Sequence, residues 1–378
     1  MTWSIIGDSY LSLFHQTITE NRLSKKDVCN AIPKPKFDLT HLYRLTDRIG
    51  ILQHARTSIP YFKTGYCLDD NSRALVLSLY AWNKTKDDKI LELMDVYISY
   101  ISFMQQQDGS FNNFLDFQRT SFVDGISDDA LGRTFWALGC LVNLAPTDSM
   151  FQIGLDMSHQ FDNQLQNLTY ARGYANGIFG LEQLIKRFPD QEKYRIMLND
   201  LANKLCYKYE NNKIEDWNWF EDTISYDNGL LPASLYVAYQ ITQNKKYLQI
   251  AEESRLFLES KCFREEWLSL IGNVRWLRKG DEFTLFAQQP VDALAMVIMY
   301  EKAYQVTKED EMIDKLLLSF YWFLGYNDLN ISLIDSETNG CHDGIEEFNI
   351  NRNQGAESMI SYLLSYHIAE PYFNHTIY

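Results

Sequence analysis

Apolar residues recur with the 3.6-residue period of an α-helix along most of the chain, in two alternating forms. In the first form the helix is amphipathic, with its charges on one face, as in the segment DDKILELMDVYISYISFMQQQ from Asp87. Such helices lie on the outside of a fold because only one face can be buried. The pattern predicts outer helices at 39–56, 87–107, 147–167, 190–210, 243–261 and 308–325.

The second form opens with a cluster of polar residues and is apolar on every side afterwards. A helix that is polar at one end only suits the inner wall of a closed ring. The alternation predicts an all-α fold, an (α/α)6 toroid of six helical hairpins over 39–378, after an N-terminal helical extension over 1–38. The polar clusters that open the inner helices start at Asp69, Asp128, Ala171, Tyr226, Gln288 and Asn353.

Because all of these clusters open inner helices, they are expected to gather at the same end of the ring. Asp, Asn and Gln at such positions also cap free backbone N–H groups, and Pro232 and Pro290 suit a first helical turn. The longest connections precede inner helices and are expected to cover that end; they are 108–127, 211–225, 262–287 and 326–352. Segment 262–287 can accommodate two strands.

Length, charge and cysteine content narrow the classes of function. A chain of 378 residues is longer than a usual single-core domain, which suits a large closed architecture. The net charge of −15 repels a phosphate backbone and argues against nucleic acid as a partner. No apolar stretch reaches the ~18–20 residues needed to cross a bilayer, and no signal peptide opens the chain, so a cytoplasmic protein without a membrane partner is expected. The six cysteines form no C-x-x-C pair, so reduced thiols are expected, with no metal and no cofactor.

The aromatic content points to carbohydrate as the ligand, since aromatic residues make up 14% of the chain and sugars stack on flat faces. Cleavage of a glycoside needs one carboxylic acid to protonate the leaving oxygen and a second carboxylate to activate water or attack the anomeric carbon. The catalytic candidates at or before the inner-helix starts are Asp70, Asp129, Glu221, Asp227 and Glu357. We expect the set Asp70, Asp129, Asp227, Gln289 and Glu357 to converge on one cavity.

Two inner-helix starts combine acids with arginines at helical spacing. Asp129, Arg133 and Trp136 share one face, where Arg133 is expected to hold Asp129 ionised and Trp136 to form a sugar-stacking wall. Asp69 and Arg73 repeat the i, i+4 spacing. Of each consecutive pair, 69–70 and 128–129, one aspartate is expected to face the lumen and the other to cap the helix. The alternative is that both acid–arginine pairs are structural and close the ring.

The segment DWNWFED at 216–222, followed by Tyr226, Asp227 and Asn228, is the densest mixture of carboxylates and aromatics in the chain. Aromatic faces supply stacking area, and carboxylates and amides fix hydroxyl groups by hydrogen bonds. Trp219 is expected to stack on the ligand. The alternative is a loop pinned by buried tryptophans, with its acids in solvent.

Glu357 lies in the first turns of the last inner helix, where Gly355 leaves room for a ligand. Burial beside apolar neighbours would raise its pKa and suit proton donation, whereas an ordinary role is to complement the helix dipole. Glu221 or Glu357 is the expected proton donor, and Asp129 or Asp70 the ionised partner. The residues expected to bind substrate are Asp69, Asn71, Arg73, Arg133, Trp136, Arg172, Trp219, Tyr226, Asn228, Gln289, His342, Asp343 and Gln354.

Six outer and six inner helices with acidic inner-helix starts resemble the six-hairpin glycosidases, whose active cleft lies at the N-terminal ends of the inner helices. The segments YCLDDNSRAL, DGISDDALGRTFWALG, DWNWFEDTISYDNGLLPASL and NQGAESMISYLL are similar to an uncharacterised bacterial helical domain often fused behind a retaining glycosyltransferase domain. The opening MTWSIIGDSYLSLF resembles the last helix of such a glycosyltransferase. The resemblance implies a glycosyltransferase as a possible partner, whereas the nucleotide-sugar-binding part of that family is missing here.

These observations favour a carbohydrate-active enzyme, a glycoside hydrolase that uses paired carboxylates on an oligosaccharide or other glycan. Two alternatives stay open. A sugar 2-epimerase would use the same toroid but needs histidine acid/base groups near the inner-helix starts, where only His342 is expected. A non-catalytic glycan-binding module associated with a glycosyltransferase would keep the aromatic residues and tolerate the loss of any one carboxylate.

Overall fold

The computed structural model of the chain describes residues 35–120, 122–123, 127–264 and 266–377, together with Gly7, Tyr10, Leu11 and Ile32. The helical extension predicted over 1–38 lies almost wholly outside the described residues. Within the described part, helices dominate and strands are two residues long.

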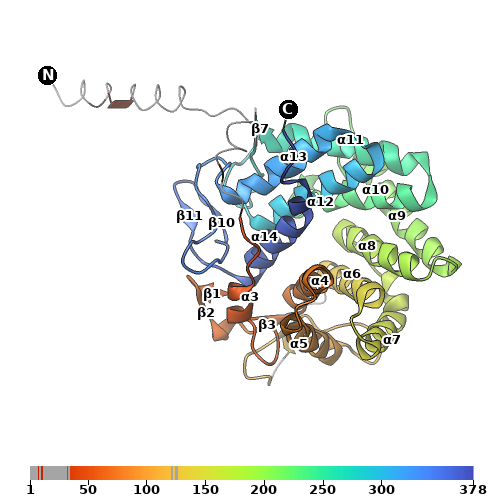
Figure 1. The fold of residues 1–378 in the computed structure, drawn as a ribbon. Helices are drawn as coiled ribbons and strands as arrows, with labels where there is room; N and C mark the ends of the chain where they lie inside the picture. Colours follow the sequence, from red (N-terminus) through yellow and green to blue (C-terminus); the bar gives the residue numbers. More distant parts are fainter. Residues whose placement is uncertain are drawn as a thin grey trace.

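Six of the described helices form a closed inner ring (Figure 1). Each contacts the next, and the last contacts the first, so the ring has no open edge. They are buried on almost every side, as the uniformly apolar pattern predicts. The inner helices are α4 (Leu68–Thr85), α6 (Asp128–Leu144), α8 (Ala171–Arg187), α10 (Leu230–Thr242), α12 (Pro290–Thr307) and α14 (Ala356–Ala369).

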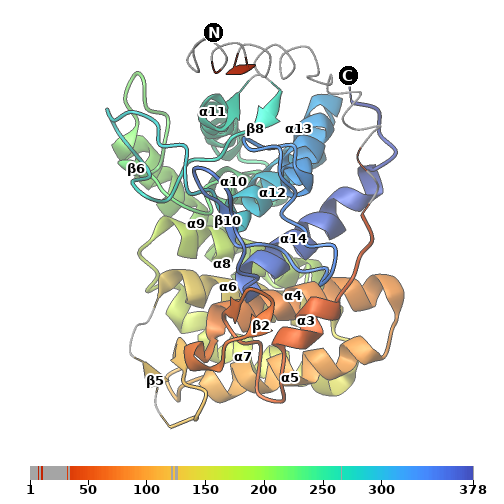
Figure 2. The same cartoon turned by 90° about the vertical axis from the view of Figure 1, so that its left-hand side faces the viewer.

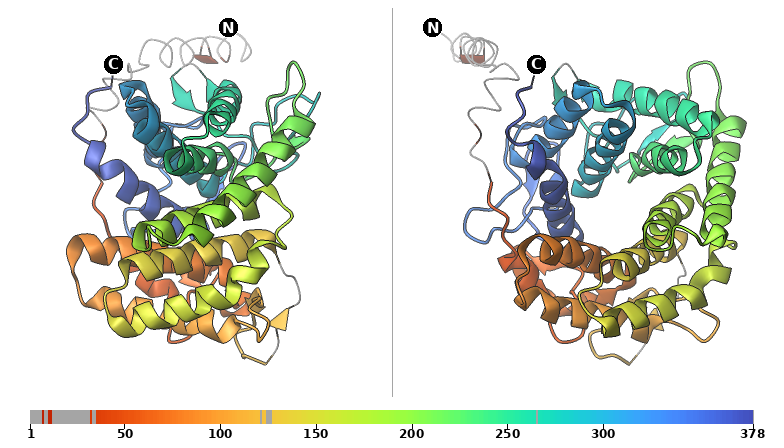
Figure 3. Two further views of the ribbon diagram at one scale, coloured as in Figure 1. Left: turned by 90° about the vertical axis from the view of Figure 1, so that its right-hand side faces the viewer. Right: turned by 45° about the vertical axis from the view of Figure 1, so that its right-hand side comes forward.

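The outer helices pack against the ring and expose one face to solvent, and the right-hand view of Figure 3 shows the two layers. Five of them follow the predicted segments, and short turns link each to the inner helix before it. The outer helices of the described residues are α3 (Thr40–Leu45), α5 (Lys89–Met104), α7 (Asp148–Leu165), α9 (Glu192–Asn212), α11 (Lys245–Cys262) and α13 (Asp310–Tyr321). The (α/α)6 toroid is therefore confirmed.

The outer helix predicted over 39–56 is wrong, because α3 ends at Leu45. Thr46 is extended, and the Asp47 carboxylate accepts the backbone N–H of Ile49 at 2.7 Å. A short polar side chain that bonds the backbone two residues on competes with helix formation. The chain instead bends over the inner-helix end and brings residues 51–54 towards it.

The long connections carry the strands and cover the end of the ring at which the inner helices begin. Figure 2 looks onto this end, with β2, β6 and β10 in view. Segment 262–287 holds strands, as the sequence allowed, and the other loops hold strands too short for a two-residue period to be visible. The strands are β1 (Ala55–Arg56), β2 (Ile59–Pro60), β3 (Tyr66–Cys67), β4 (Phe114–Leu115), β5 (Phe122–Val123), β6 (Thr223–Ile224), β7 (Phe263–Arg264), β8 (Trp267–Leu268), β9 (Leu277–Arg278), β10 (Gly344–Ile345) and β11 (Ile350–Asn351). Short 3-10 helices are η1 (Phe62–Thr64), η2 (Trp322–Leu324) and η3 (Glu370–Tyr372).

Three of the inner helices begin a few residues later than their polar clusters. Helix α10 begins at Leu230, because Asp227 adopts a left-handed conformation (φ 53°) that a helix cannot continue. Helices α12 and α14 begin at Pro290 and Ala356. The polar residues before these helices therefore lie on the rim rather than in a first turn.

The thiols agree with a further expectation. The described cysteines are free and buried: Cys67, Cys140, Cys206, Cys262 and Cys341. Among the described residues, none of the helices is both long enough and apolar enough to cross a membrane.

Candidate active site

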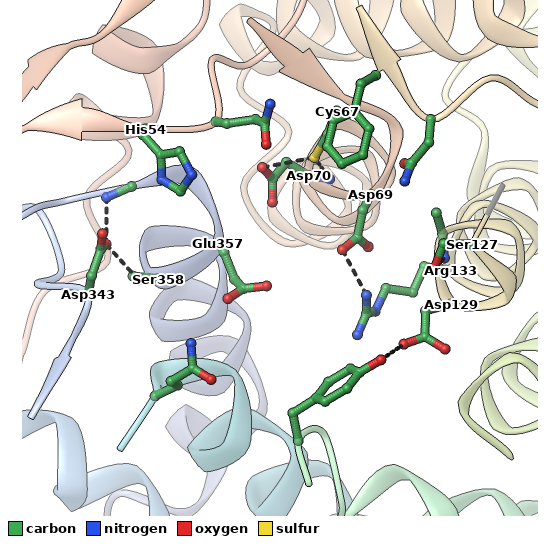
Figure 4. Close-up of a pocket in the computed structure, with 17 residues that line it drawn as sticks. His54, Cys67, Asp69, Asp70, Ser127, Asp129, Arg133, Asp343, Glu357 and Ser358 are labelled. Carbon is green, nitrogen blue, oxygen red and sulfur yellow. Dashed lines mark hydrogen bonds and ion pairs between the residues drawn. The ribbon is translucent and has the colours of Figure 1, made fainter. Parts of the chain in front are cut away.

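The first turns of α4, α6 and α14 enclose a pocket of about 380 Å³ at the loop-covered end of the ring (Figure 4). We call it the acidic pocket. Loop residues before α4, α6, α10, α12 and α14 complete its wall. Its lining residues are Gln53, His54, Cys67, Asp69, Asp70, Asn113, Phe114, Ser127, Asp129, Ala130, Arg133, Tyr226, Gln289, Asp343, Gly355, Glu357 and Ser358.

Of the five residues expected to converge on one cavity, the structure brings four to this pocket: Asp70, Asp129, Gln289 and Glu357. Asp227 lies just behind the wall, where it is 3% exposed and bonds the Arg133 guanidinium. The convergence arises because the residues stand at equivalent places in parallel inner helices of one ring.

Asp69 and Asp70 both line the pocket, so the expectation that only one of them faces the lumen is wrong. Arg73 Nη2 lies 2.6 Å from Asp69 Oδ2 and 3.8 Å from Asp70 Oδ1. The two carboxylate oxygens can therefore be no farther apart than the sum of these distances. In the second pair Asp129 lines the pocket, as expected, but Asp128 does not cap α6, whose N-cap is Ser127; it accepts the backbone N–H groups of residues 169 and 170, at 2.5 and 2.8 Å.

The environments of Asp69 and Asp70 push their pKa values in opposite directions. Burial alone would raise the pKa of Asp69, but the Arg133 and Arg73 guanidiniums outweigh it and lower that pKa. Burial raises the pKa of Asp70 against the opposing charge of Arg73, and the charges of Asp69 and Glu357 raise it further. Asp69 is therefore ionised at neutral pH, whereas Asp70 readily holds a proton. This corrects the expectation that Asp70 is an ionised partner.

The helical spacing suggested that Arg133 pairs with Asp129, and this expectation is wrong. Arg133 Nη1 donates to Asp69 Oδ2 at 2.7 Å and its Nη2 donates to Asp227. The i, i+4 spacing places Arg133 on the same face as Asp129, but the long guanidinium reaches a carboxylate on α4 and another in the loop before α10. Asp129 instead accepts the Tyr226 hydroxyl, which comes from the loop before α10.

Glu357 lies in the first turn of α14, and its side chain is 42% exposed to the pocket. Its Oε2 accepts Arg73 Nη2 at 2.7 Å. A guanidinium, rather than apolar neighbours, is therefore its nearest partner, which does not favour the predicted role of proton donor.

The second predicted donor, Glu221, does not line the pocket. Its carboxylate accepts Arg172 Nη1 at 2.8 Å, and Arg172 also bonds the Tyr226 carbonyl at 2.6 Å and Ser225. Asn228 completes this cluster, since its Oδ1 lies 3.3 Å from Arg172 Nη2. Arg172, Glu221 and Asn228 therefore hold the loop that presents Tyr226, one layer behind the wall.

Both tryptophans expected to stack on sugar lie elsewhere. Trp219 is fully buried and packs against Phe220 and Phe257, so it belongs to the core. The alternative of a loop pinned by buried tryptophans holds for Trp219, but Glu221 and Asp227 pair with arginines instead of lying in solvent. Trp136 stands two turns beyond Asp129, about 10 Å along the helix axis, and lines a different cavity. Spacing of i, i+7 places two residues on one face but not at one depth.

The remaining predicted binding residues support the pocket from behind, apart from Asp343. Asp343 lines the pocket and accepts the Gly355 N–H and Ser358 hydroxyl at 2.7 and 2.8 Å, which positions the start of α14. The Asn71 side chain bonds the backbone of residues 51 and 67. Gln354 bonds Thr338 and Asp335, and His342 is buried with its Nε2 3.9 Å from Asp335.

The sequence missed several pocket residues, of which His54 is chemically the most important (Figure 4). His54 is exposed and lies in the loop after α3, which the periodicity assigned to an outer helix. Gln53 was missed for the same reason, whereas Asn113, Phe114 and Ser127 lie in the connection 108–127, which was expected to cover this end of the ring but gave no sign of which side chains reach the pocket. Their only sequence signal is that they precede inner helices.

Comparisons with protein families and with curated proteins found no match. Solved structures of the same fold include a sugar epimerase from a ruminal bacterium, with a TM-score of 0.68, 12% identity and coverage of 88% of this chain and 94% of that chain. Cellobiose 2-epimerase from Bacillus thermoamylovorans B4167 has a TM-score of 0.66, 12% identity and coverage of 87% and 95%. These similarities establish the toroid fold.

A mannanase provides a third similar structure. The GH76A alpha-1,6-mannanase from Salegentibacter sp. HEL1_6 has a TM-score of 0.61, 11% identity and coverage of 92% of this chain and 99% of that chain. Inactive variants of that enzyme, with two consecutive aspartates replaced, form complexes with alpha-1,6-mannotetrose and alpha-1,6-mannotriose.

Proposed function

We propose that the chain is a glycoside hydrolase in which the consecutive aspartates Asp69 and Asp70 carry out the reaction. The observation that carries this proposal is that both carboxyls line one pocket while their pKa values are pushed apart. Two neighbouring acids with divergent pKa values supply the proton donor and the ionised partner that glycoside cleavage needs.

In the proposed reaction Asp70 protonates the glycosidic oxygen and the Asp69 carboxylate attacks the anomeric carbon. Asp70 then removes a proton from the water that hydrolyses the glycosyl-enzyme. Their oxygens are each within 3.8 Å of Arg73 Nη2, so their separation falls below the ~6.5–9.5 Å of inverting glycosidases. The geometry therefore favours retention of anomeric configuration.

The substrate class proposed is an oligosaccharide with α-linked mannose. The mannanase of similar fold loses activity when two consecutive aspartates are replaced, and it binds alpha-1,6-mannotetrose. In this chain Asp69–Asp70 is the consecutive pair with both members in the acidic pocket. A pocket of about 380 Å³ holds one or two sugar rings, and the open rim leaves room for the rest of a chain.

The test is hydrolysis of α-1,6-mannotetraose, within a panel of manno-, gluco- and galacto-oligosaccharides, by the parent and by Asp69→Asn and Asp70→Asn. Each variant should lose at least ~10²-fold in turnover, because proton transfer and nucleophilic attack contribute this much or more. Asp128→Asn is the matched control, since Asp128 belongs to the other consecutive pair but bonds the backbone before α8. Equal losses in all three variants would contradict the assignment.

A sugar 2-epimerase or isomerase is the second candidate, and His54 is the observation that favours it. An epimerase must move a proton at the carbon beside the carbonyl, and imidazole suits that step near neutral pH. The experiment is to incubate the protein with D-mannose and with cellobiose in D2O and follow deuterium incorporation by NMR. The epimerase would become the better account if the parent protein incorporates deuterium but hydrolyses no glycoside, and if His54→Ala no longer incorporates deuterium.

Saturable oligosaccharide binding without turnover of either kind would favour the third candidate, a non-catalytic glycan-binding module. The partnership with a glycosyltransferase stays a prediction from the sequence resemblance. Its test is co-purification of the chain with a glycosyltransferase encoded beside it.

A further inference from the structure

A second cavity, of about 420 Å³, opens at the other end of the ring. We call it the distal pocket. Residues from the middle to the C-terminal ends of α4, α6, α8, α12 and α14 line it, whereas the acidic pocket takes first-turn residues of α4, α6 and α14. Residues that mark its position near the helix ends are Asn83, Asn143, Lys186, Gln305 and His367.

The two pockets are separate sites. Asp70 and Asn83 lie on the same helix, about 20 Å apart at ~1.5 Å per residue. None of the described residues lines both pockets, and Trp136 of the distal pocket lies about 10 Å along α6 from Asp129 of the acidic pocket. A ligand in the distal pocket therefore does not touch the carboxylates proposed to cleave glycosides.

Aromatic rings form much of the distal wall. Trp136 packs against Phe179 with ring centroids 5.2 Å apart, and Tyr80 stacks on His367 at 5.3 Å with planes 4° apart. Tyr372 adds a further ring from η3. These flat surfaces suit the apolar face of a pyranose ring.

Polar groups of both hydrogen-bonding types stand among these rings. Asn143 donates to Gln183 at 2.9 Å, and Gln305 donates to Glu301 at 2.8 Å. Amides and carboxylates that face a cavity bind hydroxyl groups, because a hydroxyl both donates and accepts.

The charges in the distal pocket balance. Glu182 pairs with Lys186 at 2.7 Å, and Glu301 pairs with Lys302 at 3.3 Å. Burial lowers the pKa of His367 to about 4, so this ring is neutral at pH 7. A charged ligand would disturb pairs that are already satisfied, whereas a neutral one leaves them intact.

From this combination of stacked rings, amide groups and balanced charge, we infer that the distal pocket is a second carbohydrate site, which binds an uncharged mono- or disaccharide. Trp136, which the sequence predicted to stack on a sugar, lines this pocket and not the acidic pocket. The inference concerns binding alone and does not depend on the hydrolase proposal.

The test is isothermal titration of the full chain with D-mannose, D-glucose and cellobiose, using Gln305→Trp to fill the distal pocket. Filling should weaken binding of the bound saccharide at least ~10-fold, or about 1.4 kcal/mol. Gln240→Trp is the matched control: Gln240 also lies two residues before the end of an inner helix, but α10 contributes none of the described distal lining residues. Gln289→Trp narrows the acidic pocket, which Gln289 lines, and should spare the binding that Gln305→Trp weakens.

Crystals of the parent protein soaked with the same sugars supply a measurement that does not depend on any variant. Saccharide density beside Trp136 and Gln183 is the expected result. The inference is overturned if none of the three sugars binds, or if binding falls in Gln289→Trp but not in Gln305→Trp. It is also overturned if soaked crystals hold saccharide in the acidic pocket alone.

Discussion

Asp69 and Asp70 are identical side chains at consecutive positions, yet their surroundings give them opposite acid strength. Two guanidiniums face Asp69, whereas Asp70 is buried beside two other carboxylates. Arg73 and Arg133 create this difference, and neither belongs to the proposed reacting pair. The chemistry of the acidic pocket therefore rests on buried arginines that a ligand need not touch.

Arg133 is predicted to be essential for the fold as well as for the site. Its two Nη atoms bridge Asp69 and Asp227, a geometry that the single ammonium of lysine cannot reproduce. Arg133→Lys should lower the free energy of unfolding by about 2 to 3 kcal/mol, because it leaves a buried carboxylate unpaired. Denaturant unfolding measures the loss. Arg195→Lys is the control, since Arg195 makes one long bond, 3.4 Å, to a carbonyl; a loss as large there would contradict the bridge.

Asp292 is predicted to make stability depend on pH. Burial raises its pKa well above the ordinary value, and it accepts the Asp227 N–H at 2.6 Å. Below pH ~4 both the folded and unfolded states hold this proton, so the group has no effect. As the pH rises, the unfolded state releases the proton first, so folding becomes progressively less favourable.

Asp292→Asn removes this penalty and keeps the acceptor oxygen. The difference in unfolding free energy between variant and parent should move in the variant's favour by more than ~1 kcal/mol from pH 5 to pH 8. Urea unfolding at both pH values measures it. Asp156→Asn, at an exposed position of α7, should give a difference that does not change with pH. A flat profile for Asp292→Asn would show that the buried carboxyl is ionised throughout.

At the scale of elements, glycines allow α6 and α8 to approach each other closely at their backbones. A Cβ added at Gly139 would lie 2.4 Å from the Gly180 carbonyl oxygen. A Cβ at Gly132 would meet the Gly173 carbonyl at 2.8 Å. This approach fixes the spacing between α8 and α6, and the first turn of α6 lines the acidic pocket.

Gly139→Ala is predicted to destabilise the protein although alanine is the better helix former by ~1 kcal/mol. The methyl group meets backbone that cannot move aside, so a net loss of about 1 to 3 kcal/mol is expected. Thermal unfolding measures it. Gly154→Ala meets only the flexible side chain of Leu141, and the loss there should be clearly smaller. If Gly139→Ala raised the melting temperature, the two helices would not be in backbone contact.

At the scale of the whole molecule, the ring is closed by α14, which packs against both α4 and α12. Arg73 and Glu357 connect the first and last inner helices across this closure. The acidic pocket spans the same junction, since Asp69 and Glu357 are among its lining residues. Chain ends far apart in sequence therefore build one site.

A chain that stops at Gly325 and so lacks α14 is predicted not to form the native ring. The apolar surfaces of α4 and α12 would lose their buried neighbour, and exposed apolar surface promotes association. Loss of the near-UV circular dichroism signal and binding of a hydrophobic dye, relative to the full chain, are the expected observations. A monomer with the native spectrum would show that the ring does not need its closing helix.

The sequence by itself determined the helices, their alternation between outer and inner layers, and the end of the ring at which the acids gather. The 3.6-residue period carries this information because burial of a helix face depends on neighbours within the same helix. Prolines and polar clusters placed most inner-helix starts within a few residues, although the predicted capping by Asp, Asn and Gln is wrong: Cys67 and Ser127 cap α4 and α6, and the other inner helices have no side-chain cap. Among the outer helices, the prediction of a helix over 39–56 is wrong, because the Asp47 side chain bonds the backbone and the helix ends before it.

Only the tertiary structure decided which side chains meet. Arg133 pairs with Asp69 and Asp227 and not with Asp129. Trp219 lies in the core, and His54 lines the pocket from a loop. These outcomes depend on the distances between helices that are far apart in sequence. Packing contacts, such as the one at Gly139, determine those distances. The directions of the pKa shifts follow from the same distances, because burial and the charges of other helices cause them.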